Sequence, residues 1–352
     1  MKAVQLFKIG DFRVVDVPKP VPKGDQILVQ VGSCGICGSD IPRIFELGTS
    51  KQKYPLTIGH EFCGEIVEVG EKVDKKNIGK RGAIFPCIPC KKCDPCLSGH
   101  YAMCEDYDYL GSRSDGGFSE YCLVPSLWHF VESNNNNLSD EELSMVEPCT
   151  VAQHAIRRSD FTAGNSILIF GAGPIGQMAA NWAKIFGASL VVLVDVVEEK
   201  VEFARKQNHI VLNSTKVDIK EEFKKINNQK LPDVIIEGTG SGNALCQAIE
   251  CCKTFGTIVL MGNPNRDTNI KLSDHSLILR KELNIKGSWN SHYNNSPINE
   301  WYYTVKMLDE EKMKVKNLIT HKSNLNNLPK LCEDIYKKNI SICKAIYSKN
   351  EK

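Results

Sequence analysis

Residues 166–195 read SILIFGAGPIGQMAANWAKIFGASLVVLVD, and they carry the strongest structural signal in the chain. The apolar runs at 166–170 and 190–195 predict two buried strands, and the segment between them has a helical pattern. Two later apolar runs, DVIIEGTG at 233–240 and GTIVLMG at 256–262, are again separated by helix-like segments. Strands that alternate with helices predict an α/β domain with a parallel, doubly wound sheet.

The turn after the first strand is Gly171-Ala172-Gly173-Pro174-Ile175-Gly176, which fits the pattern G-x-G-x-x-G. In this context the first glycine permits a tight turn, the second lets the backbone approach a pyrophosphate, and the third allows close packing of helix and strand. Asp195 ends the second strand, where a carboxylate binds ribose hydroxyls and repels a 2′-phosphate. The stretch therefore predicts a Rossmann domain that binds NAD rather than NADP, with Gly171, Gly173, Pro174, Ile175, Gly176 and Asp195 as cofactor-binding residues.

The first 150 residues have a different character. Short β-like runs such as FRVVDV at 12–17, QILVQV at 26–31 and GEIVEVG at 64–70 are separated by Gly and Pro, which predicts an irregular β-rich domain. Before the Rossmann segment, Ser139 and Glu142 have the spacing of a helix capping box. After about residue 290 the pattern becomes mixed again, so the sequence predicts two domains.

The composition excludes several classes of function. The 352 residues include 44 basic and 42 acidic side chains, and a net charge of +2 gives no electrostatic footprint for nucleic acid or an anionic membrane. The N-terminus MKAVQLFKIG lacks the apolar run of a signal peptide, so we expect a cytoplasmic protein. In that reducing compartment the 15 cysteines are expected to be thiols or metal ligands rather than disulfides.

Five cysteines lie in the stretch CIPCKKCDPCLSGHYAMC at 87–104. An iron–sulfur site is one interpretation, but the ferredoxin run has three residues before its last Cys and a Pro after it, whereas Cys96 follows two residues and precedes Leu97. A nucleic-acid-binding zinc module is a second interpretation, which the near-neutral charge disfavours. The third is a structural zinc site with four thiolates, in which no catalysis occurs.

A second set of metal-ligand types lies earlier in the chain. Cys37 is followed by Ser39 and Asp40, and His60-Glu61 comes some twenty residues later. A catalytic zinc usually has three protein ligands and one open position. The third ligand has two candidates, Glu147 and the softer Cys149, and their chemistry alone does not choose between them.

These motifs occur in a characteristic order: CGSD at 37–40, GHEFCGEIVEVG at 59–70, the cysteine cluster, DGGFSEY at 115–121, EPCTVAQHA at 147–155, and GAGPIG. In this order the chain resembles the zinc-dependent medium-chain dehydrogenases of the polyol type along essentially its whole length. The resemblance implies a catalytic zinc on Cys37, His60 and Glu147, with Cys149 as the alternative ligand and Glu61 beside the metal or bound to it. Asp40 would orient His60, and Ser39 would take the substrate proton. A chain of this fold that served only as a binding protein would be expected to have lost these ligands.

The same resemblance assigns the cysteine cluster to a structural zinc bound by Cys90, Cys93, Cys96 and Cys104. Cys87 is then the one cysteine of the cluster that is not a ligand, and the chain is expected to bind two zinc ions. The resemblance also implies a GroES-like catalytic domain formed by residues 1–149 and 289–352, with the zinc lobe at about 87–104, around a Rossmann domain at 150–288. We expect a homodimer or a homotetramer, between which the sequence does not choose.

Four stretches resemble the polyol-phosphate members of the family: SDIPRIFELG at 39–48, YPLTIGHEF at 54–62, YDYLGSRSDGGFSEY at 107–121 and ILRKELNIKGSWN at 278–290. They imply oxidation of galactitol 1-phosphate to tagatose 6-phosphate with NAD. A phosphorylated substrate needs cationic donors, and Arg43, Arg113 and Lys281 in these stretches are the candidates. The alternative substrate is a non-phosphorylated polyol of the sorbitol or L-iditol type.

Overall fold

The computed structural model describes residues 1–295 and 297–351. The chain forms two compact units: unit 1 consists of Met1–Pro148 and His292–Lys352, and unit 2 consists of Cys149–Ser291. Unit 2 is therefore a single continuous segment, whereas unit 1 is built from both ends of the chain. The break after Pro148 falls within helix α4, Val146–Arg158.

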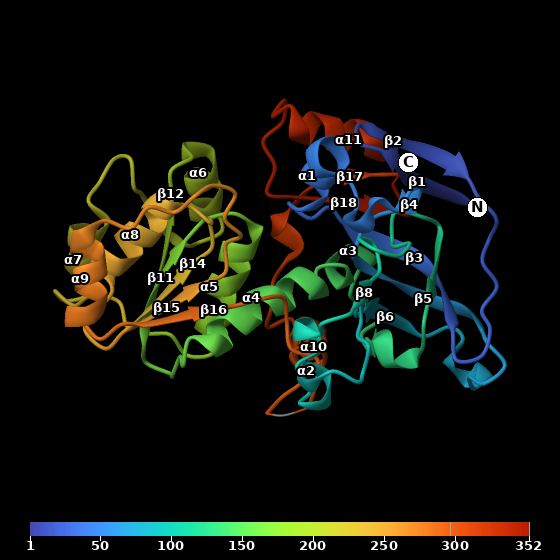
Figure 1. Cartoon of the computed structure of the whole chain (residues 1–352), viewed down its shortest axis with the longest axis horizontal. Helices are drawn as coiled ribbons and strands as arrows, with labels where there is room; N and C mark the ends of the chain where they lie inside the picture. Colours follow the sequence, from blue (N-terminus) through green and yellow to red (C-terminus); the bar gives the residue numbers. More distant parts are fainter. Residues whose placement is uncertain (296, 352) are drawn as a thin grey trace. The chain divides into compact units, whose positions relative to one another are not determined.

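Unit 2 contains one six-stranded sheet in which all neighbouring strands are parallel (Figure 1). Its order is β13-β12-β11-β14-β15-β16, which is the strand order of a Rossmann fold. The predicted doubly wound sheet is therefore confirmed. The strands are β11 Ser166–Phe170, β12 Leu190–Asp195, β13 Ile210–Asn213, β14 Val234–Glu237, β15 Thr257–Leu260 and β16 Asn284–Gly287.

Helices connect these strands and cover both faces of the sheet (Figure 1). They are α5 Pro174–Ile185, α6 Glu198–Lys206, α7 Ile219–Ile226, α8 Gly242–Cys251 and α9 Leu272–Arg280. Because the central strands are covered on both faces, their side chains are apolar at nearly every position rather than at alternate ones. All five residues of β11 are buried, which explains why SILIF is a continuous apolar run.

Unit 1 is rich in β-structure, as predicted. Its strands are β1 Lys2–Lys8, β2 Asp11–Asp16, β3 Ile27–Gly35, β4 Leu56–Thr57, β5 Glu61–Val69, β6 Arg81–Ile84, β7 Cys87–Ile88, β8 Asp108–Tyr109, β9 Tyr121–Val124, β10 Phe130–Glu132, β17 Ile319–Ser323 and β18 Lys344–Ser348. They form sheets in the orders β2-β1-β4, β10-β6-β5-β3-β18-β17 with β9 also on β3, and β7-β8.

The largest of these sheets joins the two ends of the chain. Strand β18 lies between β3, with which it is antiparallel, and β17, with which it is parallel. On its other side β3 pairs with β5, and Gly35 is the register partner of Glu61. The C-terminal strand β18 is therefore the direct neighbour of β3, which precedes the motif at 37–40. It is separated only by β3 from β5, which begins in the motif at 59–61.

The helices of unit 1 have between three and ten residues. They are α1 Asp40–Pro42, α2 Asp94–Leu97, α3 Asp140–Leu143, α10 Glu300–Asp309 and α11 Leu328–Tyr336. Single turns of 3-10 or π type complete the unit at Arg43–Leu47, Ser50–Gln52, Lys75–Asn77, Tyr101–Met103, Leu127–His129 and Lys316–Leu318. The predicted capping box at the start of α3 is confirmed, because Ser139 and Glu142 each accept a hydrogen bond from the other's backbone N–H.

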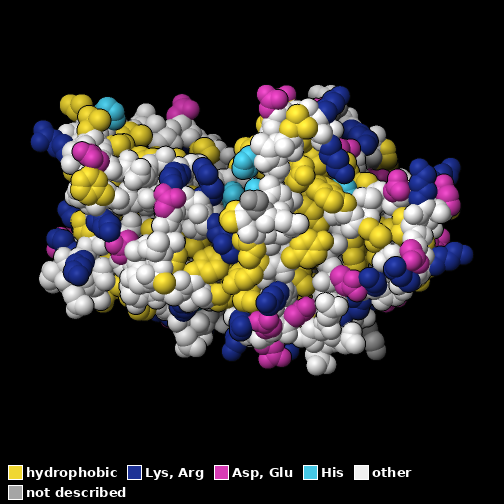
Figure 2. Space-filling view, turned by 90° about the horizontal axis from the view of Figure 1, so that it is seen from below, with side chains coloured by type: hydrophobic (Ala, Val, Ile, Leu, Met, Phe, Trp, Pro, Cys, Tyr) yellow, Lys and Arg dark blue, Asp and Glu magenta, His cyan; other side chains and the backbone are white. Residues whose placement is uncertain are grey.

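The molecular surface agrees with the balanced composition. On the face that Figure 2 presents, acidic and basic side chains are interspersed rather than gathered into an area of one sign. Among the helices that the structure describes, none combines the length and the apolar character needed to cross a membrane.

Candidate active site

Cys37, His60 and Glu61 come together in unit 1. One potential ligand atom from each lies within 4.8 Å of the others. Cys37 follows the end of β3, and His60 directly precedes β5, which begins at Glu61. Because β3 and β5 are paired neighbours, two motifs that lie twenty residues apart in the sequence meet at one end of the sheet.

The surroundings of this group fit a metal cation. His60 Nδ1 is buried and has no hydrogen-bond partner among the described residues. Burial, together with the nearby carboxylates of Glu61 and Asp40, raises the pKa of the Cys37 thiol to about 12. A thiol, an imidazole and a carboxyl gathered this closely are suited to a divalent cation, which favours the ionised forms of the thiol and the carboxyl.

The two candidates for the third ligand differ in position. Glu147 lies in the first turn of α4, is buried, and accepts a hydrogen bond from Tyr109 Oη at 3.4 Å. Burial raises the pKa of its carboxyl to about 8, against the opposing effect of the nearby His60. The group within 4.8 Å contains Glu61 and neither Glu147 nor Cys149. Cys149 is a buried residue of unit 2, and its carbonyl accepts a hydrogen bond from Trp182 Nε1 at 2.8 Å.

Asp40, Arg43 and Ser39 lie close to the group. Asp40 is buried, and its Oδ1 lies 3.7 Å from His60 Nδ1, which is too long for a hydrogen bond. Its Oδ2 accepts from the Cys37 N–H at 3.0 Å, and Arg43 Nη1 donates to Oδ1 at 2.8 Å. Ser39 is exposed and its side chain does not cap α1, so its hydroxyl is accessible.

One residue of this site was not predicted from the sequence. Lys344, the first residue of β18, is buried; its ammonium forms an ion pair with Glu61 Oε2 and donates to the Ile36 carbonyl at 3.0 Å. No local motif marks this lysine, because its partners are reached only through the pairing of β18 with β3. A buried strand position occupied by Lys in KAIYS was the only available signal.

The four cysteines expected at the structural zinc also come together. The Sγ atoms of Cys90, Cys93, Cys96 and Cys104 lie within 4.8 Å of one another, with 4.0 Å between Cys90 and Cys96 and 3.9 Å between Cys93 and Cys104. Tetrahedral zinc with Zn–S bonds of about 2.3 Å places its sulfurs about 3.8 Å apart. The backbone N–H groups of Lys92 and Cys93 lower the pKa of Cys90 to about 6, which favours a thiolate.

Cys87 lies outside this group. It is buried, and its Sγ donates to the carbonyl of Tyr101 at 3.6 Å. The ring of Tyr101 packs edge-on against Trp128 at 5.2 Å, and the Lys91 ammonium lies 4.6 Å from the centre of the same indole ring. The lobe is therefore attached to the rest of unit 1 through contacts of Tyr101 and Lys91 with Trp128.

In unit 2 the glycine turn has the geometry that a dinucleotide requires. Gly171 has φ +104°, and a Cβ at Gly176 would lie 1.9 Å from the Gly171 carbonyl oxygen. No atom lies within 4 Å of the position where a Cβ at Gly173 would stand, so a ligand can approach the backbone there. Pro174 begins α5 and Ile175 follows it, and a helix N-terminus at this point favours a pyrophosphate.

Asp195 ties the glycine turn to the end of β12. Its Oδ2 accepts from the Ala172 N–H at 2.9 Å, and its Oδ1 accepts from Val196 and Val197 N–H at 2.8 and 3.0 Å. The carboxylate is therefore fixed beside the turn, and Oδ2, which accepts one hydrogen bond, retains a lone pair for a ribose hydroxyl.

Lys281 requires a correction. Its ammonium donates to the carbonyls of Ile249, Glu250 and Cys252 at 3.1, 2.9 and 2.8 Å, at the C-terminal end of α8. An ammonium has three protons, and all three are used. The structure gives Lys281 a capping role, so we remove it from the candidate phosphate-binding residues.

Arg113 remains a candidate. Its guanidinium stacks on the Tyr107 ring at 3.8 Å and donates from Nη1 to the Tyr107 carbonyl at 2.6 Å, which leaves other N–H groups available. It lines a pocket of about 570 Å³ in unit 1 that contains three cationic and two acidic side chains. The lining residues are Ser50, Lys53, Ile88, Pro89, Cys90, Lys92, Asp106, Tyr107, Asp108 and Arg113.

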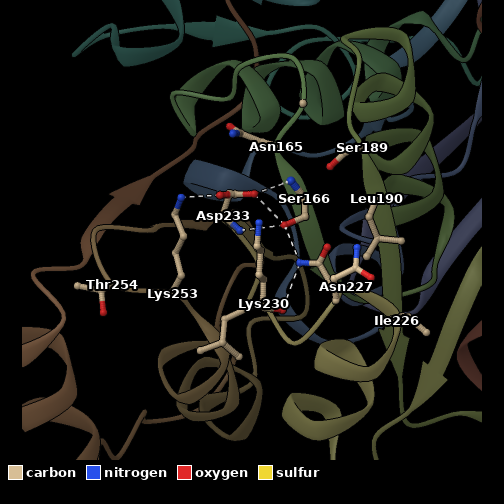
Figure 3. Close-up of a pocket in the computed structure, with 13 residues that line it drawn as sticks. Asn165, Ser166, Ser189, Leu190, Ile226, Asn227, Lys230, Asp233, Lys253 and Thr254 are labelled. Atoms are coloured by element: carbon tan, nitrogen blue, oxygen red, sulfur yellow. Dashed lines mark hydrogen bonds and ion pairs between the residues drawn. The ribbon is translucent and has the colours of Figure 1, made fainter.

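A further pocket, of about 800 Å³, lies in unit 2 at the amino ends of β11 and β12 (Figure 3). There Asp233 accepts from Ser166 N and Oγ at 2.7 and 2.8 Å and pairs with Lys253 at 2.5 Å. Cofactors of such sheets bind at the carboxyl ends of the strands, where the glycine turn lies. This pocket is therefore not the dinucleotide site.

Comparison with known proteins agrees with this geometry. Residues 23–133 match the family described as alcohol dehydrogenase GroES-like domain, and residues 174–310 match the family described as zinc-binding dehydrogenase. The crystal structure of galactitol-1-phosphate dehydrogenase from Escherichia coli superposes with a TM-score of 0.91 at 31% identity, over 99% of this chain and 100% of that one.

Two sequence relatives are named after different polyol substrates. Galactitol 1-phosphate 5-dehydrogenase of Escherichia coli strain K12 is 32% identical over 337 residues, which is 95% of this chain and 96% of that protein. Sorbitol dehydrogenase of Bacillus subtilis strain 168 is 34% identical over 272 residues, which is 76% of each. The predicted family is confirmed: the chain belongs to the zinc-dependent medium-chain dehydrogenases of the polyol dehydrogenase type.

Proposed function

We propose that this enzyme oxidises a secondary alcohol of a polyol phosphate with NAD, converting galactitol 1-phosphate to tagatose 6-phosphate. The observation that carries the reaction class is the close group of Cys37, His60 and Glu61, in which His60 and Glu61 are buried and His60 Nδ1 has no hydrogen-bond partner among the described residues. The substrate is supported by the 32% identity to galactitol 1-phosphate 5-dehydrogenase along 95% of the chain.

In this proposal Cys37, His60 and Glu61 hold a catalytic zinc, and Glu147 is a second carboxylate beside them. When bound, the zinc supplies a Lewis acid that makes the substrate hydroxyl more acidic. Ser39 takes the hydroxyl proton, for which its exposed position is suitable. Asp40 fixes the Cys37 loop through the Cys37 N–H and is itself held by Arg43. Cys90, Cys93, Cys96 and Cys104 hold a second, structural zinc.

The cofactor is proposed to be NAD because a fixed carboxylate lies at the end of β12. Asp195 is held by three backbone N–H groups, so it cannot move away to admit a 2′-phosphate without losing these bonds. The pyrophosphate would lie over Gly173, where the backbone is open.

The phosphate of the substrate is proposed to meet Arg113, with Lys53 and Lys92 lining the same pocket. Aromatic rings connect this pocket with the catalytic group: His60 contacts Tyr109 at 5.9 Å between ring centres, and Tyr109 contacts Tyr107 at 6.2 Å. Arg43 is a secondary candidate for binding the phosphate, because one of its N–H groups is already bound to Asp40 and only the others are available.

The test is a panel of polyols and polyol phosphates, assayed by NADH formation at 340 nm with NAD and with NADP. We expect kcat/KM to be highest for galactitol 1-phosphate with NAD, and a chelator to abolish turnover. Equal kcat/KM for galactitol and galactitol 1-phosphate would overturn the phosphate assignment, and a preference for NADP would overturn the role of Asp195.

The second candidate is a sorbitol or L-iditol dehydrogenase, favoured by the 34% identity to the Bacillus sorbitol dehydrogenase. It predicts turnover of sorbitol at a rate that Arg113→Ala leaves unchanged. The homodimer or homotetramer and the cytoplasmic location expected from the sequence remain predictions.

A further inference from the structure

Three neighbouring strands of unit 1 meet beside the catalytic group. Glu61 begins β5, Gly35 ends the adjacent β3, and Lys344 begins β18 on the other side of β3. Gly35 is the register partner of Glu61 on one side and of Ile346 on the other. The Lys344 side chain therefore reaches Glu61 across the strand that carries Gly35.

The ion pair between Lys344 and Glu61 is almost fully removed from solvent, with side-chain exposures of 5% and 2%. Charged groups at such depth are unfavourable without a partner, so each depends on the other. The Lys344 ammonium also donates to the Ile36 carbonyl, which directly precedes Cys37. One side chain thus contacts both segments that supply the catalytic group.

Gly35 provides the space for this contact. A Cβ at position 35 would lie 2.1 Å from Glu61 Oε2, closer than a Cβ can approach, and 3.0 Å from Lys344 Cε, which is a tight contact, so the ion pair would have to shift. The backbone of Gly35 has no positive φ that would otherwise explain a glycine there. The lack of a side chain at position 35 therefore serves the ion pair.

We propose that Lys344 is a positioning residue that holds Glu61 by Oε2 and leaves only Oε1 to face the metal. A carboxylate can bind a metal through one oxygen or through both, and a catalytic zinc must keep one coordination position open for substrate. The lysine prevents the second oxygen of Glu61 from filling that position. This inference rests on the proposed zinc site and extends it to a residue from the C-terminal segment.

The test replaces zinc by Co²⁺ and compares the visible absorption spectrum of the wild type with that of Lys344→Met. The proposal predicts weaker Co²⁺ absorption in the variant, because a second bound oxygen raises the coordination number. It also predicts a 10- to 100-fold loss in kcat, which Lys344→Arg restores in part by keeping a cation beside Oε2. An unchanged Co²⁺ spectrum in a folded Lys344→Met variant would overturn it.

Gly35→Ala tests the same contact with both charges retained, and it decides the question if Lys344→Met does not fold. It should produce the same spectral change, and an unaltered spectrum would count against the proposal. Lys322→Met is the matched control, since Lys322 lies on the neighbouring β17 and pairs with Glu141 at 3.1 Å near the surface; it should leave the spectrum and kcat unchanged. A wild type that binds no Co²⁺ would instead overturn the zinc site itself.

Discussion

The third ligand of the catalytic group can be identified by single substitutions. Since Glu61, and not Glu147, shares the 4.8 Å group with Cys37 and His60, we expect Glu61→Gln to lower the zinc content from the proposed two ions per chain toward one. Glu147→Gln should retain both ions and lower kcat/KM by about 10-fold, a typical effect of a residue beside the metal ligands. Cys149→Ser is the control and should have little effect on the zinc content and on kcat/KM.

Metal analysis combined with kcat/KM distinguishes the alternatives. Loss of one zinc in Glu147→Gln, with both ions kept in Glu61→Gln, would restore Glu147 as the ligand. Loss of zinc in Cys149→Ser would assign the position to that thiol.

Arg113 and Lys281 form a contrasting pair of cations. A hydrogen bond to a charged group contributes about 1.5–3 kcal/mol, so Arg113→Ala should lower kcat/KM for galactitol 1-phosphate by about 10- to 100-fold. The same change should leave kcat/KM for galactitol within about 2-fold, because that substrate lacks the charge. Steady-state kinetics with both substrates tests this.

Lys281→Met is the matched control for Arg113→Ala. Its ammonium caps three carbonyls of α8, so removing it should lower Tm by a few degrees, about 4 °C, while the substrate preference stays as in the wild type. A loss of preference in Lys281→Met would return this residue to the phosphate site.

Sequence patterns predicted those parts of the candidate site that depend on short spacings. Cys37, His60 and the four lobe cysteines were named because ligand types at short spacings occur in motifs that resemble those of the family. Lys344 was missed because its contact with Glu61 exists only through the strand order β5-β3-β18. Lys281 was assigned to the phosphate site because the sequence does not show whether a cationic side chain faces a ligand or the end of a helix.

The cysteine lobe between β7 and β8 is an element whose stability we expect to depend on metal. Its helix α2 has four residues, too few to form without support. Cys93→Ser should remove one of four ligands and lower the free energy of unfolding by about 3 kcal/mol, or roughly 10 °C in Tm. Thermal unfolding measured by circular dichroism, with and without chelator, tests this.

Cys87→Ser is the comparison for Cys93→Ser, because Cys87 is a buried thiol of the same lobe that lies outside the group of four. We expect a Tm change of only a few degrees, with the chelator effect preserved. If Cys87→Ser removed the chelator effect, the identity of the odd cysteine would be wrong.

The strands of unit 2 were more predictable than those of unit 1. A strand buried on both faces is a continuous apolar run, and β11 and β12 show this in their sequence. The capping box at α3 was predictable because both of its residues lie within one turn. The sheets of unit 1 were not predictable in the same way. Strands β4 and β7 have only two residues each, and their pairing depends on residues that are distant in the sequence.

The stability of the whole molecule should decrease in mild acid. Burial lowers the pKa of His129 to about 4, although its ring hydrogen-bonds the Phe85 carbonyl at 3.1 Å. In the unfolded chain the pKa of histidine is about 6.5. Between these values the unfolded state binds the proton and the folded state does not, so the free energy of unfolding falls as the pH decreases from 6.5 to 4.

Each pKa unit corresponds to about 1.36 kcal/mol. The lowered pKa of His129 therefore changes the free energy of unfolding by about 3 kcal/mol over the full range from pH 6.5 to pH 4. Urea unfolding at pH 7.5 and pH 5.5 should therefore show a smaller pH dependence in His129→Gln, which retains an N–H donor and does not titrate. An identical pH dependence in the wild type and the variant would show that His129 does not contribute. His209, whose pKa burial also lowers to about 4, adds to the slope in both proteins.

The position of β18 between β3 and β17 has a consequence for biosynthesis. Domains generally fold as they emerge from the ribosome, in order from the N-terminus. Unit 2 is complete once Ser291 has emerged, but the large sheet of unit 1, whose first strand in the sequence is β3, must wait for Lys344–Ser348. A nascent chain that lacked β18 would carry a complete Rossmann unit and a sheet in which the end of β3 at Ser33–Gly35 has an unpaired edge, which is a template for aggregation. The large sheet of unit 1 thus remains incomplete during synthesis for longer than the Rossmann unit does.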